Sequence, residues 1–222
     1  MMRWIGLLIV MLAATAHAAD AELAALAHGT DYGALGAVET RARERALAEP
    51  DDFDAQLAGA EVGLVVANRL RLERKIVGDM PDDRNDAYRD MQAQWAEDVL
   101  PFAERALELA GDDAQRAQAE RVLGELYAHK IRGMLTGMVN GPRARRHIGR
   151  ALDLAPEDPE CQRAIGLMYL NNPPISGGDV SKAIETFRSC AEALPDERCV
   201  VLLAMSYRKA GRLDEARDTA EV

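Results

Sequence analysis

Apolar residues recur along most of this 222-residue chain at intervals of three and four, the spacing that gathers them on one face of an α-helix. No stretch alternates apolar and polar residues in the manner of a β-strand. The pattern predicts a last helical pair that starts at Asp196, and before it helices over about 20–50, 53–76, 82–110, 114–132, 142–154, 159–170 and 179–193. We therefore expect an all-α fold.

A short motif returns three times in the second half of the chain. It consists of Leu or Ile, then Gly or Ala, then Tyr, and it occupies residues 123–127, 165–169 and 203–207. Each copy leads into a second helical stretch, and the first two of these end at Pro156 and Pro195. A recurring helical pair predicts stacked hairpins, because one hairpin cannot bury its apolar face alone.

From about Gly111 to Val222 these residues resemble the tetratricopeptide repeat family. Its pattern needs small residues where two helices cross closely, and a Tyr ring fills the gap beside them. The resemblance implies antiparallel helical hairpins stacked as a tetratricopeptide-like solenoid over residues 111–222. Residues 19–110 match the pattern loosely, and we expect them to form divergent N-terminal helical hairpins.

The turn of the second hairpin is longer than the family spacing and contains Pro173, Pro174, Gly177, Gly178 and Asp179. This turn motif resembles an exported bacterial subgroup that includes the T-components of TRAP transporters, periplasmic repeat subunits that accompany solute-binding proteins. Structural punctuation by itself accounts for the motif completely. The prolines stop one helix, the glycines permit a tight reversal, and the aspartate caps the next helix.

Residues 1–18 have the pattern of a cleaved signal peptide. A cationic start at Arg3 precedes a mostly apolar stretch over residues 4–16, and small residues at Ala16 and Ala18 fit a cleavage site. The apolar stretch is too short to span a bilayer, and no later stretch is long and apolar enough to hold the mature chain in a membrane. We expect a periplasmic protein. The alternative is a buried N-terminal helix.

The formal net charge is -10, which disfavours nonspecific binding to nucleic acid or to anionic membranes by the protein as a whole. Residues 129–150 are a local exception because they contain no acidic residue. The segment could receive an anionic ligand, an acidic partner or lipid head groups, or it could be a solvated helix face balanced by acidic neighbours. Its basic residues are Lys130, Arg132, Arg143, Arg145, Arg146 and Arg150.

Within the same segment, Gly133, Gly137 and Gly141 alternate with Met and other apolar residues. Small residues at this spacing permit close helix contact, but three glycines so close together favour a pliable loop. We expect a Met-rich loop that could serve as an adaptable contact surface.

Cys161, Cys190 and Cys199 would lie in a compartment that permits disulfides. The repeat register allows Cys190 to pair with Cys161 or with Cys199, and it equally allows all three to be small buried residues. None has a histidine nearby in the sequence, which argues against a catalytic thiol.

The resemblance also implies a concave groove lined by the first helix of each hairpin. Transferred by register, the groove positions are Arg121, Glu125, His129, Arg163, Leu167, Asn171, Val201, Met205 and Arg208. This mixed polar and apolar set suits a helix or an extended peptide. The chain's own N-terminal helices could instead occupy the groove.

No catalytic constellation, metal-ligand spacing or phosphate-binding loop is evident, so we expect neither an enzyme nor a cofactor. The function that fits best is a periplasmic helical-repeat protein that binds an unknown protein or peptide partner, not nucleic acid. It would do so through its groove and the basic segment. The alternative is a small-ligand-binding accessory component of a TRAP-type transport system.

Overall fold

A computed structural model describes residues 32–76, 82–193 and 197–220. Over these residues the protein is all-α and contains no strand, which confirms the predicted fold class. The helices are α2 (Tyr32–Ala48), α3 (Phe53–Ile76), α4 (Asp82–Leu109), α5 (Asp113–His129), α6 (Met134–Leu154), α7 (Pro159–Asn171), the short 3-10 helix η1 (Pro174–Ser176), α8 (Val180–Ala193), α9 (Glu197–Lys209) and α10 (Leu213–Ala220). The predicted signal peptide and the predicted helix before Tyr32 lie outside the described residues.

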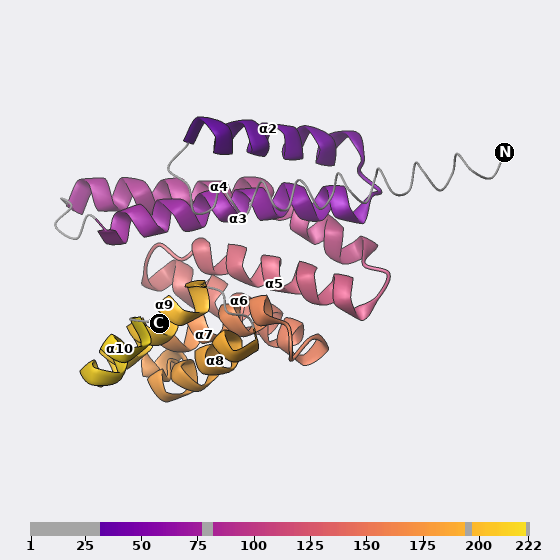
Figure 1. The fold of residues 1–222 in the computed structure, drawn as a ribbon. Coiled ribbons are helices and arrows are strands. Elements are labelled where there is room, and N and C mark those ends of the chain that lie inside the picture. Colours follow the sequence, from indigo (N-terminus) through magenta and orange to yellow (C-terminus); the bar gives the residue numbers. More distant parts are fainter. Residues whose placement is uncertain (1–31, 77–81, 194–196, 221–222) are drawn as a thin grey trace.

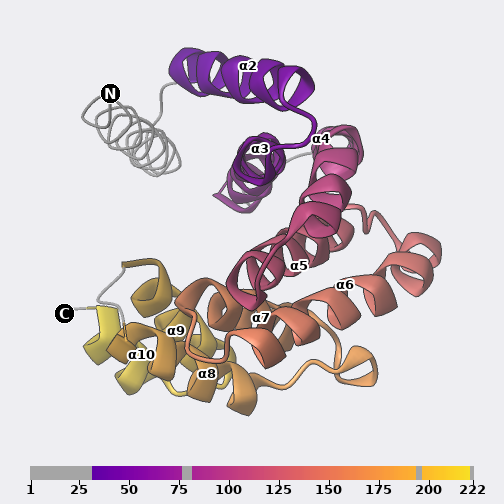
Figure 2. The same cartoon turned by 90° about the vertical axis from the view of Figure 1, so that its right-hand side faces the viewer.

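The helices stack as successive antiparallel pairs, α3 with α4, α5 with α6, α7 with α8 and α9 with α10 (Figure 1). The first helices also contact one another in order, α3 with α5, α5 with α7 and α7 with α9. In the orthogonal view the stack curves into an arc, with these first helices on its inner side (Figure 2). The arrangement is a solenoid whose concave face consists of α3, α5, α7 and α9.

In three of the helical pairs, the second helix packs directly against a glycine of the first. An added Cβ would lie 2.4 Å from Ile148 Cγ1 at Gly124, and 2.7 Å from the Phe187 ring at Gly166. At Gly63 in α3 it would lie 2.4 Å from Val99 Cγ1 in α4. These distances are too short for any side chain, so the helices approach closely because glycine stands there. The N-terminal pair α3–α4 uses the same seam as the repeats that the sequence identifies.

The three motif tyrosines occupy related environments. Tyr127 and Tyr207 are buried and Tyr169 is half-buried. A cation from the second half of each hairpin lies over each ring. These cations are Arg143 at 5.5 Å from the Tyr127 centroid, Lys182 at 5.7 Å from that of Tyr169, and Arg212 at 4.7 Å from that of Tyr207. Equivalent surroundings at equivalent positions are the structural counterpart of the repeated motif.

Helix α6 begins at Met134, eight residues before the predicted start near Pro142, so the prediction of a glycine-rich loop is wrong. The Thr136 hydroxyl accepts hydrogen bonds from the backbone N–H groups of Arg132 at 2.9 Å and Gly133 at 3.0 Å. It thereby satisfies donors that a helix start otherwise leaves free. Because this cap starts the helix, the glycines at 137 and 141 and Pro142 lie in its interior.

The turn before α8 has the geometry that its residue types suggest. Gly177 has φ 81°, a left-handed conformation that favours glycine, and a Cβ on Gly178 would lie 1.9 Å from the Asn172 carbonyl oxygen. Asp179 Oδ1 accepts hydrogen bonds from the backbone N–H groups of Ser181 at 3.0 Å and Lys182 at 3.1 Å. Local geometry therefore accounts for the motif without a ligand. No helix in the described ranges is long and apolar enough to cross a membrane.

Candidate functional site

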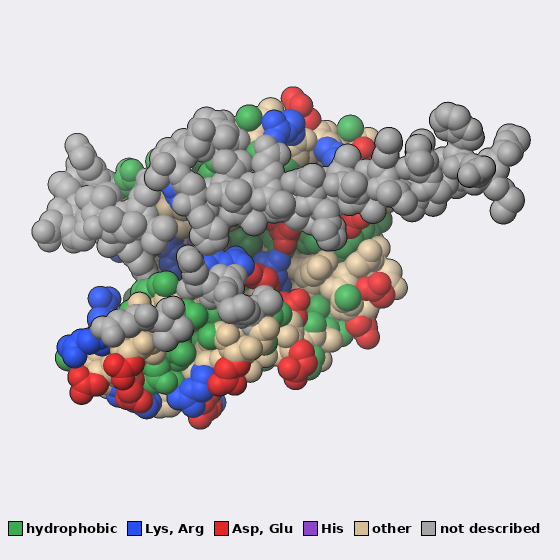
Figure 3. All heavy atoms as spheres, viewed as in Figure 1, with side chains coloured by type: hydrophobic (Ala, Val, Ile, Leu, Met, Phe, Trp, Pro, Cys, Tyr) green, Lys and Arg blue, Asp and Glu red, His purple; other side chains and the backbone are tan. Residues whose placement is uncertain are grey.

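A row of alternating charges lies along the concave face and starts between α3 and α5. The Arg121 guanidinium contacts Glu61 Oε1 at 2.5 Å and Glu125 Oε1 at 3.1 Å. Arg121 and Glu125 are both buried, and Glu61 belongs to α3, sixty residues earlier in the chain. In the described part of Figure 3, basic and acidic side chains lie side by side in the band between α3 and the helices below it.

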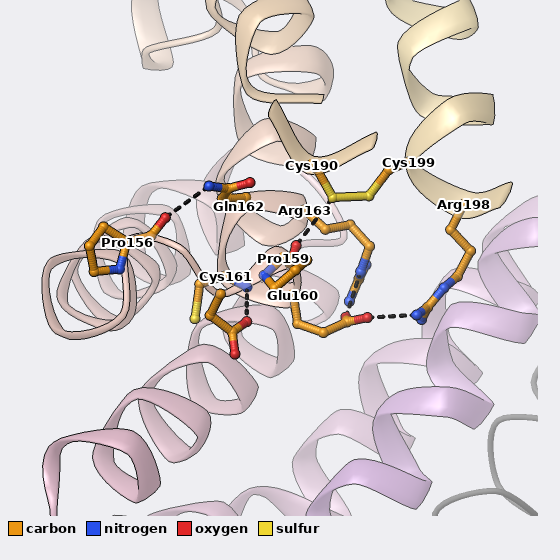
Figure 4. Close-up of a disulfide and its surroundings, with 10 residues drawn as sticks. Pro156, Pro159, Glu160, Cys161, Gln162, Arg163, Cys190, Arg198 and Cys199 are labelled. Atoms are coloured by element: carbon orange, nitrogen blue, oxygen red, sulfur yellow. Dashed lines mark hydrogen bonds and ion pairs between the residues drawn. A yellow bond between two sulfur atoms is a disulfide. The ribbon is translucent and has the colours of Figure 1, made fainter. Parts of the chain in front are cut away.

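The row continues through α7 to α9. Arg163 contacts Glu125 Oε1 at 3.2 Å and Glu160 Oε2 at 2.8 Å, and Arg198 contacts Glu160 Oε1 at 2.7 Å. Figure 4 shows the Arg163 and Arg198 side chains converging on the Glu160 carboxylate. Three arginines thus alternate with three glutamates across four first helices. We call the six residues (Glu61, Arg121, Glu125, Arg163, Glu160, Arg198) the charge ladder.

Burial and opposite charge act against each other in the charge ladder. Burial alone would lower the pKa of the Arg121 guanidinium, but Glu61 and Glu125 outweigh it and raise that pKa. Burial alone would raise the pKa of the Glu160 carboxyl, but the charges of Arg163, Arg121 and then Arg198 hold it below its ordinary value. Arg121 and Glu160 are therefore ionised near neutral pH, and each charge of the ladder lies against an opposite one.

The groove positions on α5 are closed rather than open to a ligand, which corrects the sequence prediction for Arg121, Glu125 and His129. His129 Nε2 lies 3.0 Å from Asn68 Oδ1 of α3, and His129 Nδ1 lies 2.5 Å from Gln92 Nε2 of α4. All three predicted groove residues are buried. The α3–α4 pair covers this end of the groove, as the alternative interpretation anticipated.

The sequence analysis left a cover by N-terminal helices open but did not assign it to α3 or to Asn68, although a signal exists. Aligning the seam glycines Gly63 and Gly124 places Asn68 at the position equivalent to His129. Glu61 lies two residues before the same glycine. The repeat register could therefore have been extended into the N-terminal half by its glycine instead of by the Leu-Gly-Tyr motif.

The groove opens between α7 and α9. A surface depression of about 320 Å³ lies there, lined by Leu170, Asn171, Met205, Arg208 and Lys209. Three of these residues are predicted groove positions, and Leu170 and Lys209 are their chain neighbours. Lys209 Nζ donates to the backbone carbonyl of Leu170, whereas the structure shows no ion pair for the exposed Arg208 among the described residues.

Two other predicted groove residues, Val201 and Leu167, flank this opening. Val201 is 55% exposed one turn before Met205, and Leu167 is half-buried one turn before Asn171. Arg163 belongs to the charge ladder. The open part of the groove therefore combines the partly exposed apolar side chains of Leu167 and Met205 and the exposed Val201 with the exposed cation Arg208. These features suit an extended segment with an acidic group.

The basic residues of 129–150 fall into two groups. Lys130 pairs with Glu97, Arg132 with Asp90 at 3.1 Å, and Arg150 with Glu120 at 3.5 Å. These three are balanced by acidic neighbours, as one of the two interpretations of the sequence expects. The second group comprises Arg143, Arg145 and Arg146, which have no ion pair among the described residues.

The two arginines at 143 and 145 still make contacts. The Arg143 guanidinium stacks on Tyr127, and that of Arg145 lies over the backbone of Gly177, where it meets the turn before α8. Neither contact neutralises the positive charge.

A disulfide joins Cys190 of α8 to Cys199 of α9, one of the two pairings that the sequence allowed (Figure 4). Cys161 is a free thiol, 1% exposed, so it does not form the alternative bridge. Burial, and then the nearby Asp158 carboxylate, raise the pKa of the Cys161 thiol to about 12. Cys161 is therefore protonated and inaccessible at neutral pH and is a poor nucleophile.

Within the described ranges no three His, Cys, Asp or Glu side chains gather in a way that could hold a metal ion. A second depression of about 500 Å³ lies at the α5–α6 edge, lined by Leu107, Arg116, Glu120, Arg150, Asp153 and Leu154. Its only buried charge, Glu120, is engaged by Arg150 and by His147 Nδ1 at 2.5 Å. We therefore consider the α7–α9 opening to be the candidate site.

Comparison with known proteins identifies no family for this chain. No family model matches the sequence, and no curated protein matches it. Among solved structures, a monomeric mutant of IFIT1 with Gppp-AAAA is similar over 84% of this chain, at 16% identity and a TM-score of 0.47. This chain spans 45% of the IFIT1 chain. The packing of the helices, and not this similarity, shows the class of protein: an all-α solenoid of stacked antiparallel helical hairpins.

Proposed function

We propose that the protein is a non-enzymatic periplasmic interaction module that binds an extended, acidic peptide segment in the groove between α7 and α9. The observation that carries the proposal is the open depression between these helices, with Met205 and Leu170 as apolar lining and Arg208 at its edge. An apolar strip beside an exposed cation favours a peptide that combines apolar and carboxylate side chains. A disulfide between α8 and α9 supports a location outside the reducing cytoplasm.

The charge ladder supports the same site indirectly. It ties α3, α5, α7 and α9 into one row of satisfied charges at the N-terminal ends of α7 and α9, which holds in place the two helices that form the walls of the opening. A rigid wall lowers the conformational entropy lost when a segment binds. The ladder itself leaves no buried charge for a ligand to satisfy. Recognition is therefore expected at the opening and not along the whole concave face.

Site-specific photo-crosslinking tests the proposal. A photoreactive amino acid replaces Val201, which is 55% exposed beside the depression, or Leu213, which is 60% exposed on α10 and serves as the matched control position. The full mature chain is expressed in the periplasm of its host, and the crosslinked segment is identified by mass spectrometry. We expect one predominant adduct from position 201 that is absent from position 213.

Matched charge reversals then measure the contribution of the opening. Arg208→Glu removes its cation, and Arg217→Glu on α10 changes the net charge by the same amount at an exposed arginine. We expect Arg208→Glu to weaken binding of the identified segment at least about tenfold, and Arg217→Glu to leave it unchanged. Equal crosslinking at positions 201 and 213, or equal affinities of the two variants, would refute the proposal.

A second candidate is a small-ligand-binding accessory component of a TRAP-type transport system. The observation that favours it is the modest volume of the depression, about 320 Å³, which fits a small carboxylate beside Arg208. A thermal-shift screen with small carboxylates separates the two candidates. Stabilisation that disappears in Arg208→Glu supports the small ligand, and the absence of any shift removes this candidate.

A further inference from the structure

The outer face of the first two turns of α6 is both apolar and exposed. Met134 is 81% exposed, Leu135 78%, Met138 70% and Val139 57%. Because residues four apart lie side by side on a helix, these four side chains form one continuous patch. Solvent-exposed apolar patches of this kind mark contact surfaces on soluble proteins. We call these four residues the α6 apolar patch.

Positive charge continues from the same face. Arg145 and Arg146 lie seven residues after Met138 and Val139, two helical turns further along. Together with Arg143 they are the basic residues of this segment without an ion pair among the described residues. No acidic residue occurs between 129 and 150, although the chain as a whole has a net charge of -10. Apolar side chains and unneutralised arginines thus share one helix face.

The shape of this region decides what can cover it. The first turns of α6 project from the convex side of the arc, beyond the end of α5 (Figure 2). A projecting helix end offers a single convex surface, and a bilayer can meet it without a complementary groove. A bilayer interface accepts such a surface, because it presents anionic head groups directly above an acyl boundary that takes up apolar side chains.

Charge complementarity also favours an anionic bilayer. The arginines match anionic head groups, and their long stems allow the guanidinium groups to remain at head-group level while the patch inserts. The acidic remainder of the chain is repelled by the same lipids. Attraction at α6 and repulsion elsewhere together favour an orientation in which this face of α6 meets the membrane.

From this geometry we propose that the exposed face of α6 from Met134 to Arg146 docks the protein on an anionic lipid bilayer. The α6 apolar patch inserts to the acyl boundary, and Arg143, Arg145 and Arg146 bind the head groups. The solenoid then lies on the membrane surface without crossing it. The first turns of α6 lie on the outer side of the arc, whereas α7 and α9, which line the opening, lie toward its inner side, so the groove stays free (Figure 2). This inference does not depend on what the groove binds.

Vesicle flotation of the full mature chain tests the docking. Vesicles of phosphatidylglycerol and phosphatidylcholine are compared with vesicles of phosphatidylcholine alone. We expect binding to the anionic vesicles that falls as salt is added, because head-group attraction is screened. The triple change Arg143→Glu, Arg145→Glu, Arg146→Glu should reduce the partition coefficient at least tenfold.

The control triple Arg116→Glu, Arg208→Glu, Arg217→Glu produces the same net charge at exposed arginines on α5, α9 and α10. We expect it to retain most of the binding, whereas an effect of overall charge would lower the binding of both triples equally and would overturn the proposal. Far-ultraviolet circular dichroism confirms that each variant keeps its helices.

Insertion is tested separately with Leu135→Trp. We expect its fluorescence to shift to the blue with anionic vesicles, while a tryptophan at Leu213 on α10 does not respond. Wild-type protein that stays unbound from anionic vesicles would refute the proposal. So would a protein partner that requires the α6 apolar patch while vesicle binding is absent, because it would assign the face to that partner.

Discussion

The glycine seam between α5 and α6 provides the most direct test of how the solenoid is packed. The perturbation is Gly124→Ala, which adds one methyl group. That Cβ would lie 2.4 Å from Ile148 Cγ1, 2.9 Å from the Ile148 backbone nitrogen and 3.0 Å from the Ala144 carbonyl oxygen. Ile148 is 1% exposed, so its side chain has no free space into which to rotate. Since two of the three atoms belong to backbone, the helices themselves must separate.

The magnitude follows from two opposing effects. Alanine is favoured over glycine in a helix interior by about 1 kcal/mol. Overpacking of a full core costs typically about 1–3 kcal/mol, and a contact with backbone belongs in the upper half of that range. We therefore expect Gly124→Ala to lower the free energy of unfolding by about 1–2 kcal/mol.

Gly149→Ala is the matched control, because it makes the same chemical change on α6 where an added Cβ meets no atom within 4 Å. We expect it to raise the free energy of unfolding by about 0.5–1 kcal/mol. Urea unfolding followed by far-ultraviolet circular dichroism measures both changes, provided that the slopes with urea stay equal. If both variants shift stability in the same direction by the same amount, the close seam at Gly124 does not exist.

Three further predictions concern the α7–α9 region. Replacing Cys190 and Cys199 together by Ala should lower the free energy of unfolding by roughly 2–3 kcal/mol, because a closed loop of sequence separation 9 no longer restricts the unfolded chain; an unchanged denaturant midpoint would contradict this. Cys161 should resist iodoacetamide in the native state at pH 8 and react on unfolding, as mass spectrometry can show; native-state labelling would disprove its burial. Glu160→Gln should destabilise the protein at neutral pH. The native pKa of Glu160 is depressed, so its ionised carboxylate stabilises the protein fully above the ordinary value of 4.5, and this stabilisation is lost as pH falls through the lower native value. The free energies of unfolding of the wild type and the variant should therefore converge in acid. A difference that stays constant with pH would argue against the charge ladder.

The sequence predicted the helices best where local signals were complete. The predicted helix over 53–76 coincides with α3, and the predicted helices near 114–132 and 159–170 agree with α5 and α7 to within three residues. The predicted start of α6 was wrong, because the prediction relied on the low average helix preference of glycine and proline. A single hydroxyl cap at Thr136 was sufficient to begin the helix earlier.

The candidate site was predicted in part, and the division follows from distance along the chain. Asn171, Met205 and Arg208 line the opening as the repeat register implied, because two adjacent hairpins form it. Arg121 and His129 occupy equivalent positions but are covered by α3 and α4. No residue near them in the sequence indicates that α3 and α4 cover them.

The sequence by itself determined that this protein is a series of helical pairs, since apolar periodicity and the small-residue seam are properties of short segments. Only the tertiary structure decided which inner positions stay open, which cysteine partners Cys190, and which arginines are neutralised. Each of those outcomes depends on groups brought together from distant parts of the chain, such as Glu61 with Arg121 across sixty residues. Helix formation is a local equilibrium, whereas the exposure and charge pairing of a side chain depend on the helices that pack against it from other parts of the chain.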